Sequence, residues 1–288
     1  MKTSGNPIVE FVLAALTVVL FACSDGPMTG PVYDGRYPTT FASFSSDSLA
    51  TLNKSFSVVN PTICTGLNEY GFTVGDYTAY ACTYGRGVRE DYQIAAFIAK
   101  TKVTLVQNSI FTGVKDTSCL SFTSSFARRD SWGNILTLNV NFKPQVYEGL
   151  VIQFMEIRLR MDSTGILSIS GNHFPEIHIP NSSIHPDEAQ RSLVGEVLTW
   201  YDFGGSPNEY VVTNVSFCRE LSDEAPSIEP VKVILPHITE RGIELRVAWR
   251  VEVGCDAFSH SGWWMYVDTV TGELLLSYQL FYSIAGRR

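Results

Sequence analysis

The sequence predicts an α+β protein made of two consecutive units, each with one helix followed by an antiparallel sheet. Side chains that alternate along the chain predict strands at 136–142, 157–161 and 166–170, which form an antiparallel meander with one dry face and one wet face. A helix start at Pro186, followed by two acidic residues and by Ala189, Leu193 and Val197 on one face, opens the second unit. Further strands are predicted at 210–217, 244–253, 263–267 and 273–278.

The composition indicates a globular protein, because 45% of the 288 residues are hydrophobic and 17% are charged. A formal net charge of −8 argues against nonspecific binding to nucleic acid. No apolar run reaches the roughly 18 to 20 residues that a spanning helix needs, which excludes a multi-pass membrane protein.

The first 22 residues have the layout of a lipoprotein signal peptide. Lys2 lies in a short polar start, and an uncharged apolar run follows from Phe11 to Ala22. The run ends Leu-Phe-Ala-Cys, which resembles the bacterial lipobox and makes Cys23 the predicted site of lipidation, palmitate included. The alternative is a buried cysteine in an N-terminal helix. Ser24 after the cysteine favours the outer membrane as the destination of a lipid-anchored, exported protein.

Residues 23–90 form the predicted connection between this anchor and the first unit. Residues 24–48 are rich in Ser, Thr, Gly, Pro and Asp, as in a flexible tether. Residues 55–89 carry Gly-Asp and Gly-Arg-Gly turn signals around a β-prone stretch, and predict a small β extension.

Five cysteines remain after Cys23, and an exported protein occupies a compartment in which disulfides form. None of them has C-x-x-C spacing, which argues against zinc knuckles and thioredoxin-type sites. The local bridges that the spacing allows are Cys64 with Cys82 and Cys218 with Cys255. Since five is odd, at least one thiol is free or pairs between chains.

Residues 147–172 resemble the propeptide of fungalysin- and thermolysin-type metalloproteases, with an Asp-Ser-Thr-Gly turn at 162–165 and a Ser-Gly-Asn end at 170–172. The sequence departs from this family at Phe154-Met155, where the family has a pair of glycines. Locally, residues 94–106 fit either a helix or a strand, and the resemblance implies the helix. We assign the propeptide-like unit to residues 91–180.

The second unit, residues 181–288, resembles the PepSY module that follows such propeptides. The resemblance rests on Ile184-His-Pro-Asp-Glu-Ala189 and on the closing hairpin at 245–253 and 264–274. Together the two resemblances imply two cystatin-like units. The most specific motif is Val267-Asp-Thr-Val-Thr-Gly-Glu273, in which we expect Asp268 to accept backbone N–H bonds and Gly272 to adopt a positive φ.

The catalytic motif of the protease family, His-Glu-x-x-His on a helix, does not occur in the sequence, so we expect a protein that is not an enzyme. His173 and His178 suggest a metal site only weakly, because Pro175 prevents a helix and an extended strand points them to opposite faces. We therefore expect no metal and no cofactor. Arg128 and Arg129 are interpreted as part of a solvated loop.

Three functional hypotheses remain. The chain is a membrane-anchored binding protein that inhibits or assists a thermolysin-like metalloprotease in trans, an envelope scaffold that keeps only the fold, or a relic of a protease precursor. In the first case the apolar tail, with Leu280, Phe281 and Ile284, is a candidate for the protease cleft. The alternative for this tail is that it extends the last strand and packs on the core.

Overall fold

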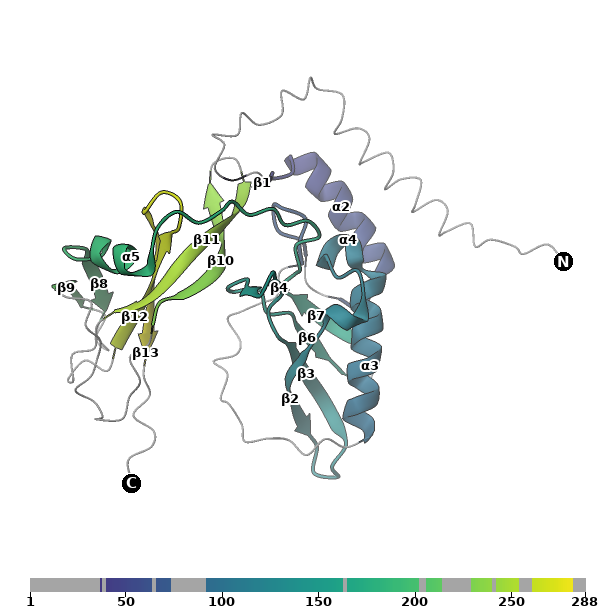
Figure 1. Ribbon diagram of the computed structural model, residues 1–288. Coiled ribbons are helices and arrows are strands. Elements are labelled where there is room, and N and C mark those ends of the chain that lie inside the picture. The colour runs from purple at the N-terminus through teal and green to yellow at the C-terminus, as the bar shows by residue number, and fades with distance from the viewer. Residues whose placement is uncertain are drawn as a thin grey trace, which may run out of the picture.

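The computed structural model describes residues 37, 40–63, 66–73, 92–162, 165–201, 206–213, 229–239, 242–253 and 261–281. Helices and antiparallel sheets make up this part of the chain, which confirms the α+β class (Figure 1). In the same part, no helix is both long and apolar enough to cross a membrane. Several predictions fall outside the described residues: the signal peptide, lipidation at Cys23, the bridges among Cys64, Cys82, Cys218 and Cys255, and the tail residue Ile284.

The first unit packs one long helix on a four-stranded sheet. The helix is α3 (Tyr92–Gln107), followed by the short α4 (Ser109–Thr112) and a 3-10 turn at Thr117–Cys119. The sheet has the antiparallel order β2-β3-β6-β7, with the bounds Phe122–Arg129, Ile135–Phe142, Arg158–Met161 and Ile166–Ser170. A small pair, β4 (Val146–Tyr147) and β5 (Leu150–Val151), lies between β3 and β6.

The helix α3 forms although its second half contains β-branched residues. Its inner side buries Ile94 and Leu105 against the sheet residues Leu138, Val140, Phe142, Leu159 and Ile169. Thr101 is also fully buried, and its hydroxyl donates to the carbonyl of Phe97 at 2.8 Å, which satisfies the polar group within the helix. Tertiary burial therefore outweighs the local strand propensity.

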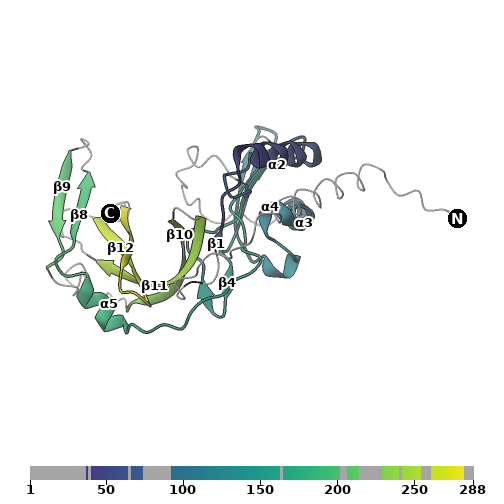
Figure 2. The ribbon, with the colours of Figure 1, turned by 90° about the horizontal axis from the view of Figure 1, so that it is seen from above.

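The second unit contains a more extended sheet. Its strands are β10 (Val231–Thr239), β11 (Gly242–Val253), β12 (Ser261–Asp268) and β13 (Leu274–Phe281), joined by β1 (Thr40–Phe41), which pairs with the start of β11. The helix α5 (Pro186–Ser192) and the hairpin of β8 (Val197–Tyr201) and β9 (Pro207–Val211) cover one side of this sheet (Figure 2).

Several predictions for strands and helices need correction. The helix that begins at Pro186 ends at Ser192, so Val197, expected on its apolar side, instead begins β8 and is 55% exposed. Strand β10 was not predicted. Arg128 and Arg129 end strand β2 and do not lie in a loop, although both side chains are exposed as expected.

Residues 46–59 form the helix α2 (Ser46–Val59), where the sequence predicted a tether and a β extension. Ser45 caps its first turn, and Leu52 and Phe56 are buried, with the Phe56 ring 4.9 Å from that of Phe111. The helix is rich in hydroxyl side chains, which favour turns in general. Here they bond to carbonyls one turn earlier, as Ser57 does to Asn53 at 2.9 Å, so they are accommodated inside the helix.

The two units meet at the segment from Ile152 to Phe154. Ile152 forms a parallel bridge to Ile234 of β10, and the Gln153 amide donates to the Ile234 carbonyl at 2.9 Å. Phe154 has a φ of 61°, in the left-handed region that glycine favours, and its ring lies 5.9 Å from that of Tyr266 and 5.6 Å from that of Tyr278. The phenylalanine thus keeps a glycine-like backbone and adds an aromatic contact between the units.

Candidate functional site: a buried carboxylate and an exposed tryptophan turn

The turn after β12 has the local structure that its sequence predicted. One carboxylate oxygen of Asp268 accepts the backbone N–H groups of Val270 at 2.7 Å and Thr271 at 3.0 Å. Gly272 has a φ of 75°, and its amide donates to the Asp268 carbonyl at 3.0 Å. Both expectations for this motif are confirmed.

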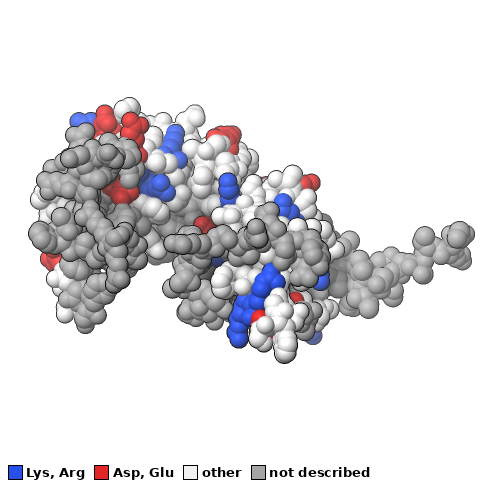
Figure 3. All heavy atoms as spheres, turned by 90° about the horizontal axis from the view of Figure 1, so that it is seen from below, with Lys and Arg blue, Asp and Glu red and all other residues white. Residues whose placement is uncertain are grey.

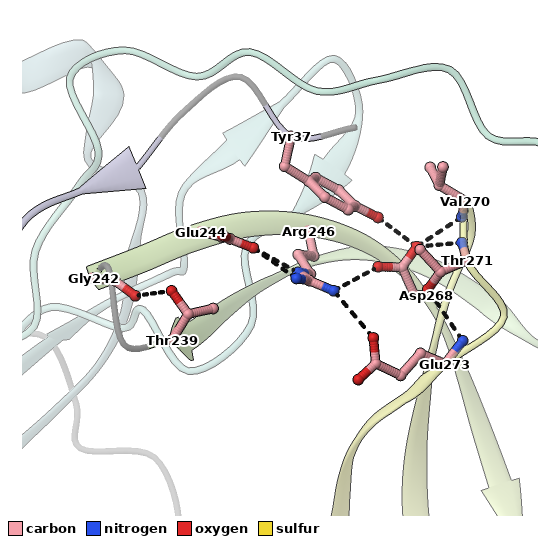
Figure 4. A network of polar contacts seen from close by, with 9 residues as sticks. All are labelled: Tyr37, Thr239, Gly242, Glu244, Arg246, Asp268, Val270, Thr271 and Glu273. Atoms are coloured by element: carbon pink, nitrogen blue, oxygen red, sulfur yellow. Dashed lines mark hydrogen bonds and ion pairs between the residues drawn. The ribbon is translucent and has the colours of Figure 1, made fainter. Parts of the chain in front are cut away.

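Asp268 is also the centre of a larger polar network (Figure 4). The Tyr37 hydroxyl donates to Oδ1 at 2.5 Å, and the Arg246 guanidinium donates to Oδ2 at 3.2 Å. The same guanidinium binds Glu244 through two nitrogens, at 2.7 and 2.9 Å, and reaches the exposed Glu273 at 3.5 Å. The Asp268 side chain is fully buried and that of Glu244 is 3% exposed, so Arg246 pairs with two carboxylates that are removed from water.

Burial and the hydrogen bond to Asp268 raise the pKa of Tyr37 far above its ordinary value, so this hydroxyl stays a donor. Burial alone lowers the pKa of Arg246, but the hydrogen bond and charge of Glu244 and the charge of Asp268 outweigh it and raise that pKa. The Tyr37 ring also lies 4.9 Å from the guanidinium. Four donors occupy the Asp268 carboxylate, and one of them comes from a residue 231 positions earlier. We call this network the Asp268 clasp, because it fastens the N-terminal segment to the closing hairpin.

The turn between β2 and β3 has similar local chemistry on the surface. One carboxylate oxygen of Asp130 accepts the backbone amides of Trp132 at 2.9 Å and Asn134 at 2.8 Å, and the other accepts the Asn134 side chain at 3.0 Å. Arg129 donates to the Gly133 carbonyl at 2.8 Å, and Gly133 takes a φ of 86°. These bonds, led by that to Asn134, lower the pKa of Asp130. Residues 129–134 thus form a hydrogen-bonded turn, which we call the Trp132 turn.

The Trp132 turn carries the most exposed large hydrophobic side chain among the described residues. Trp132 is 84% exposed, and on the adjoining strands Phe126 is 49% and Leu136 is 42% exposed. Arg128 and Arg129, both exposed, precede Trp132 where β2 ends, and Figure 3 shows blue side chains gathered at this end of the first unit. Tryptophan and arginine, with tyrosine, are enriched among the energetically dominant residues of protein interfaces.

The other residues considered from the sequence do not join either site. Leu280 and Phe281 lie in β13, where their backbones pair with Gly262 and Ser261 of β12. This placement favours an extension of the strand over an extended tail free for a cleft. Cys119 is exposed and free.

His173 and His178, which weakly suggested a metal site, differ in their exposure to solvent. His173 is buried, and burial lowers its pKa to about 4, whereas His178 is exposed. In the described part of the chain, no group of three or more His, Cys, Asp or Glu is placed to hold a metal ion.

Sequence reasoning missed the Trp132 turn, although a signal was present. Asp-Ser-Trp-Gly-Asn at 130–134 precedes a strictly alternating run, and a short Gly-containing segment of this kind is typical of a hairpin loop. The run before it, Phe122–Arg129, alternates poorly because its side chains are half-buried at most. That weak pattern hid the first strand and with it the hairpin.

Comparisons with known proteins give little sequence likeness. No protein-family model matches the chain, and no curated protein matches it in sequence. Among solved structures, the Bacillus megaterium YpeB C-terminal domain aligns with 84% of this chain and 100% of its own length, at 11% identity and a TM-score of 0.31. A likeness at that score carries no argument about function, so the propeptide and PepSY resemblances stay predictions.

Proposed function

We propose that this chain is a non-catalytic binding protein of the cell envelope and that the Trp132 turn is its contact with a folded protein partner. One observation carries the proposal: Trp132 is 84% exposed at the tip of a turn whose backbone is held by the Asp130 carboxylate. Tryptophan side chains are highly buried on average, so one that is 84% exposed on a fixed turn is a candidate contact residue.

The physical argument is one of preorganisation. Burying a large apolar side chain contributes about 1.5 to 3 kcal/mol, and the gain is largest when the segment does not have to be ordered on binding. Bonds to the Asp130 carboxylate and to the Gly133 carbonyl fix this turn before any partner arrives. The flanking arginines add donors for carboxylates at the rim of an interface.

The class of partner follows from the resemblance described under Sequence analysis. Propeptides of that family bind a protease catalytic domain, so this propeptide-like chain is proposed to bind a thermolysin-like metalloprotease in trans. Lipidation at Cys23 is proposed to hold it at the bacterial envelope, where exported proteases are found.

The decisive experiment is a titration of a thermolysin-like protease from the same source with the full chain, beside its Trp132→Ala variant. The matched control is Ile238→Ala, which truncates a 66% exposed side chain on β10 of the other unit. We expect Trp132→Ala to weaken binding by about 10- to 100-fold, the range of a central aromatic contact, and the control to bind like the parent.

Two outcomes would contradict parts of this proposal. Failure of the parent chain to bind or inhibit the protease would remove that partner. A photo-crosslinking residue at Ser131 in native envelopes would then test the scaffold alternative, in which a different envelope protein contacts the same turn. Equal binding by parent and Trp132→Ala would remove the turn as the contact.

The C-terminal tail and the anchor are tested separately. A chain that ends at Gln279 lacks Leu280, Phe281 and Ile284. If this chain inhibits the protease as strongly as the parent does, the tail has no role in the cleft.

For the lipid anchor, we expect Cys23→Ser to lose labelled palmitate and to leave the membrane pellet. If parent and variant both stay in the pellet without label, the lipidation proposal is wrong.

A further inference from the structure

We propose that two copies of this chain associate through strand β13, pairing edge to edge and antiparallel about a two-fold axis. The inference starts from composition, because β13 reads Leu-Leu-Leu-Ser-Tyr-Gln-Leu-Phe and contains no charge, proline or glycine. An apolar edge strand of this length is a template for pairing with another chain, and proteins usually blunt such edges.

The sheet order places β13 at an edge. It pairs with β12 on one side, and no strand among the described residues pairs with its other side. Three consecutive side chains, Leu276, Ser277 and Tyr278, are exposed, with Leu276 at 36% and Tyr278 at 47%. The free edge is therefore apolar and accessible within the part of the chain that the structure describes.

The other edges of the two main sheets each carry a protective feature. Strand β2 ends in two arginines. Next to β7, Thr62 donates to the Ile166 carbonyl at 3.0 Å. Strand β10 contains Lys232 and Pro236 and accepts a bond from the Gln153 amide. The remaining edge strand, β1, is only two residues long. Among the longer edge strands of these two main sheets, β13 alone lacks charge, proline and a covering segment within the described residues, and the missing protection points to a partner.

The side chain of Tyr278 on β13 belongs to a cluster of aromatic residues. Tyr278 stacks on Trp264 with ring centroids 6.3 Å apart and contacts Phe154 at 5.6 Å. With Ser277 near the two-fold axis, Leu276 of one copy lies opposite Tyr278 of the other, and both pairs project onto this cluster. Aliphatic–aromatic pairs across antiparallel strands contribute about 0.2 to 1 kcal/mol each.

Two properties of β13 favour a second copy of this chain as the strand that pairs with it: the strand is uncharged, and pairing of two copies leaves no free edge. Self-pairing sets equal charges opposite each other, and this is harmless only when the strand is uncharged, as β13 is. An isologous contact also consumes both edges at once, so association stops at two copies. The proposal is independent of the Trp132 turn, which lies on the other unit.

The test is the oligomeric state of the full chain in mild detergent, by sedimentation over a range of protein concentrations. The variant Leu276→Lys/Tyr278→Lys introduces like charges at the pairing edge, and Ile238→Lys, on β10 of the same sheet, is the matched control. We expect a dimer for the parent and the control, and at least a tenfold weaker dimer for the double variant. Circular dichroism verifies that each variant is folded.

A photo-crosslinking residue at Ser277 gives a second readout that leaves the strand uncharged. We expect covalent dimers from position 277 and none from position 238. A parent chain that stays monomeric to about 100 μM, a dimer that survives the double variant in folded form, or crosslinks to a different protein in place of a second copy would overturn the proposal.

Discussion

The Trp132 turn and the Asp268 clasp are built on the same local chemistry in opposite surroundings. In each, one aspartate oxygen accepts two backbone amides from the following residues, and a glycine takes a positive φ. Asp268 is fully buried and is also bound by Tyr37 and Arg246, whereas, among the described residues, the carboxylate of Asp130 binds within its own turn.

This difference shows what long-range contacts add to a local motif. The turn itself requires only an aspartate, a glycine and the bonds between neighbours. Burial of Asp268 makes the same carboxylate a junction between segments 22 and 231 residues away. Exposure of Asp130 instead makes its turn a platform that holds Trp132 in water. The following predictions test this division between a structural turn and a presenting turn.

The largest effect is expected for Asp268→Ala. Removing this carboxylate leaves Arg246 with Glu244 and the exposed Glu273, and it deprives the Tyr37 hydroxyl and two backbone amides of their acceptor. Each hydrogen bond to a charged group contributes about 1.5 to 3 kcal/mol, so we expect a loss of about 3 to 5 kcal/mol. The measurement is the free energy of unfolding from urea titration at pH 7. Asp268→Asn, which keeps the size but not the charge, is expected to lose less. A loss below about 1 kcal/mol for the alanine variant would contradict the structural role.

Acid is expected to weaken the fold through His173, outside both turns. Burial holds the pKa of His173 at about 4, whereas an unfolded chain has an ordinary histidine pKa near 6.5. Between these values the unfolded state binds a proton that the folded state excludes, so stability is present above pH 6.5 and is lost as pH falls to 4. The loss is about 3 kcal/mol, at roughly 1.4 kcal/mol per pKa unit.

The measurement is the free energy of unfolding between pH 7 and 4 for the parent, His173→Gln and His185→Gln. His185 is the control because its side chain is 73% exposed. We expect the glutamine at 173 to flatten the slope in this window and the glutamine at 185 to leave it unchanged. Identical slopes for all three chains would remove His173 as the cause.

A smaller effect is expected for Tyr37→Phe, which removes one donor from the Asp268 clasp and keeps the ring beside Arg246. A hydrogen bond to a charged group contributes about 1.5 to 3 kcal/mol, and a lower value applies when the remaining donors relax toward the carboxylate. Urea titration gives the free energy, and hydrogen exchange of the β1 and β11 amides locates the change. Unaltered protection of Thr40–Phe41 would show that Tyr37 does not fasten this segment.

The strongly patterned parts of the fold were predictable from sequence. Strands β3 and β6 alternate between buried and less buried side chains, because one face of the first sheet is buried and the other is wet. Strand β7 was also predicted, although its burial does not alternate and its register to β6 is shifted near Met161. The helix α3 was reached only through the resemblance to propeptides, since its own residues favour neither state clearly. Strand β10 was missed because Pro236 argues against a strand, and its edge position explains why proline is tolerated there.

The candidate sites divide in the same way. The bonds within the Asp268 turn were predicted, because they are made by neighbours in the sequence. Arg246, Glu244 and Tyr37 were not recognised as partners, since only the pairing of β11 with β12 and with β1 brings them to Asp268. The exposure of Trp132 was equally hidden, because a sequence shows that a residue is large and apolar but not that its turn projects from the sheet.

The smallest effect on stability is expected for Asp130→Ala, which opens the Trp132 turn and touches no buried group. The hydrogen bonds from Asn134 and neighbouring amides lower the pKa of Asp130, so the turn is closed above the ordinary aspartate pKa and opens as pH falls through the lowered value. Exchange of the Trp132 and Asn134 amides, followed by NMR, should therefore accelerate in acid and in the variant at pH 7. The Val270 and Thr271 amides, bound to the buried Asp268, should keep their protection in both cases.

The parent and Asp130→Ala should unfold at nearly the same urea concentration. The variant should bind its partner more weakly, because Trp132 is no longer held in place. If Asp130→Ala lowers the free energy of unfolding as much as Asp268→Ala does, the two turns contribute equally to stability, and the distinction between them is wrong.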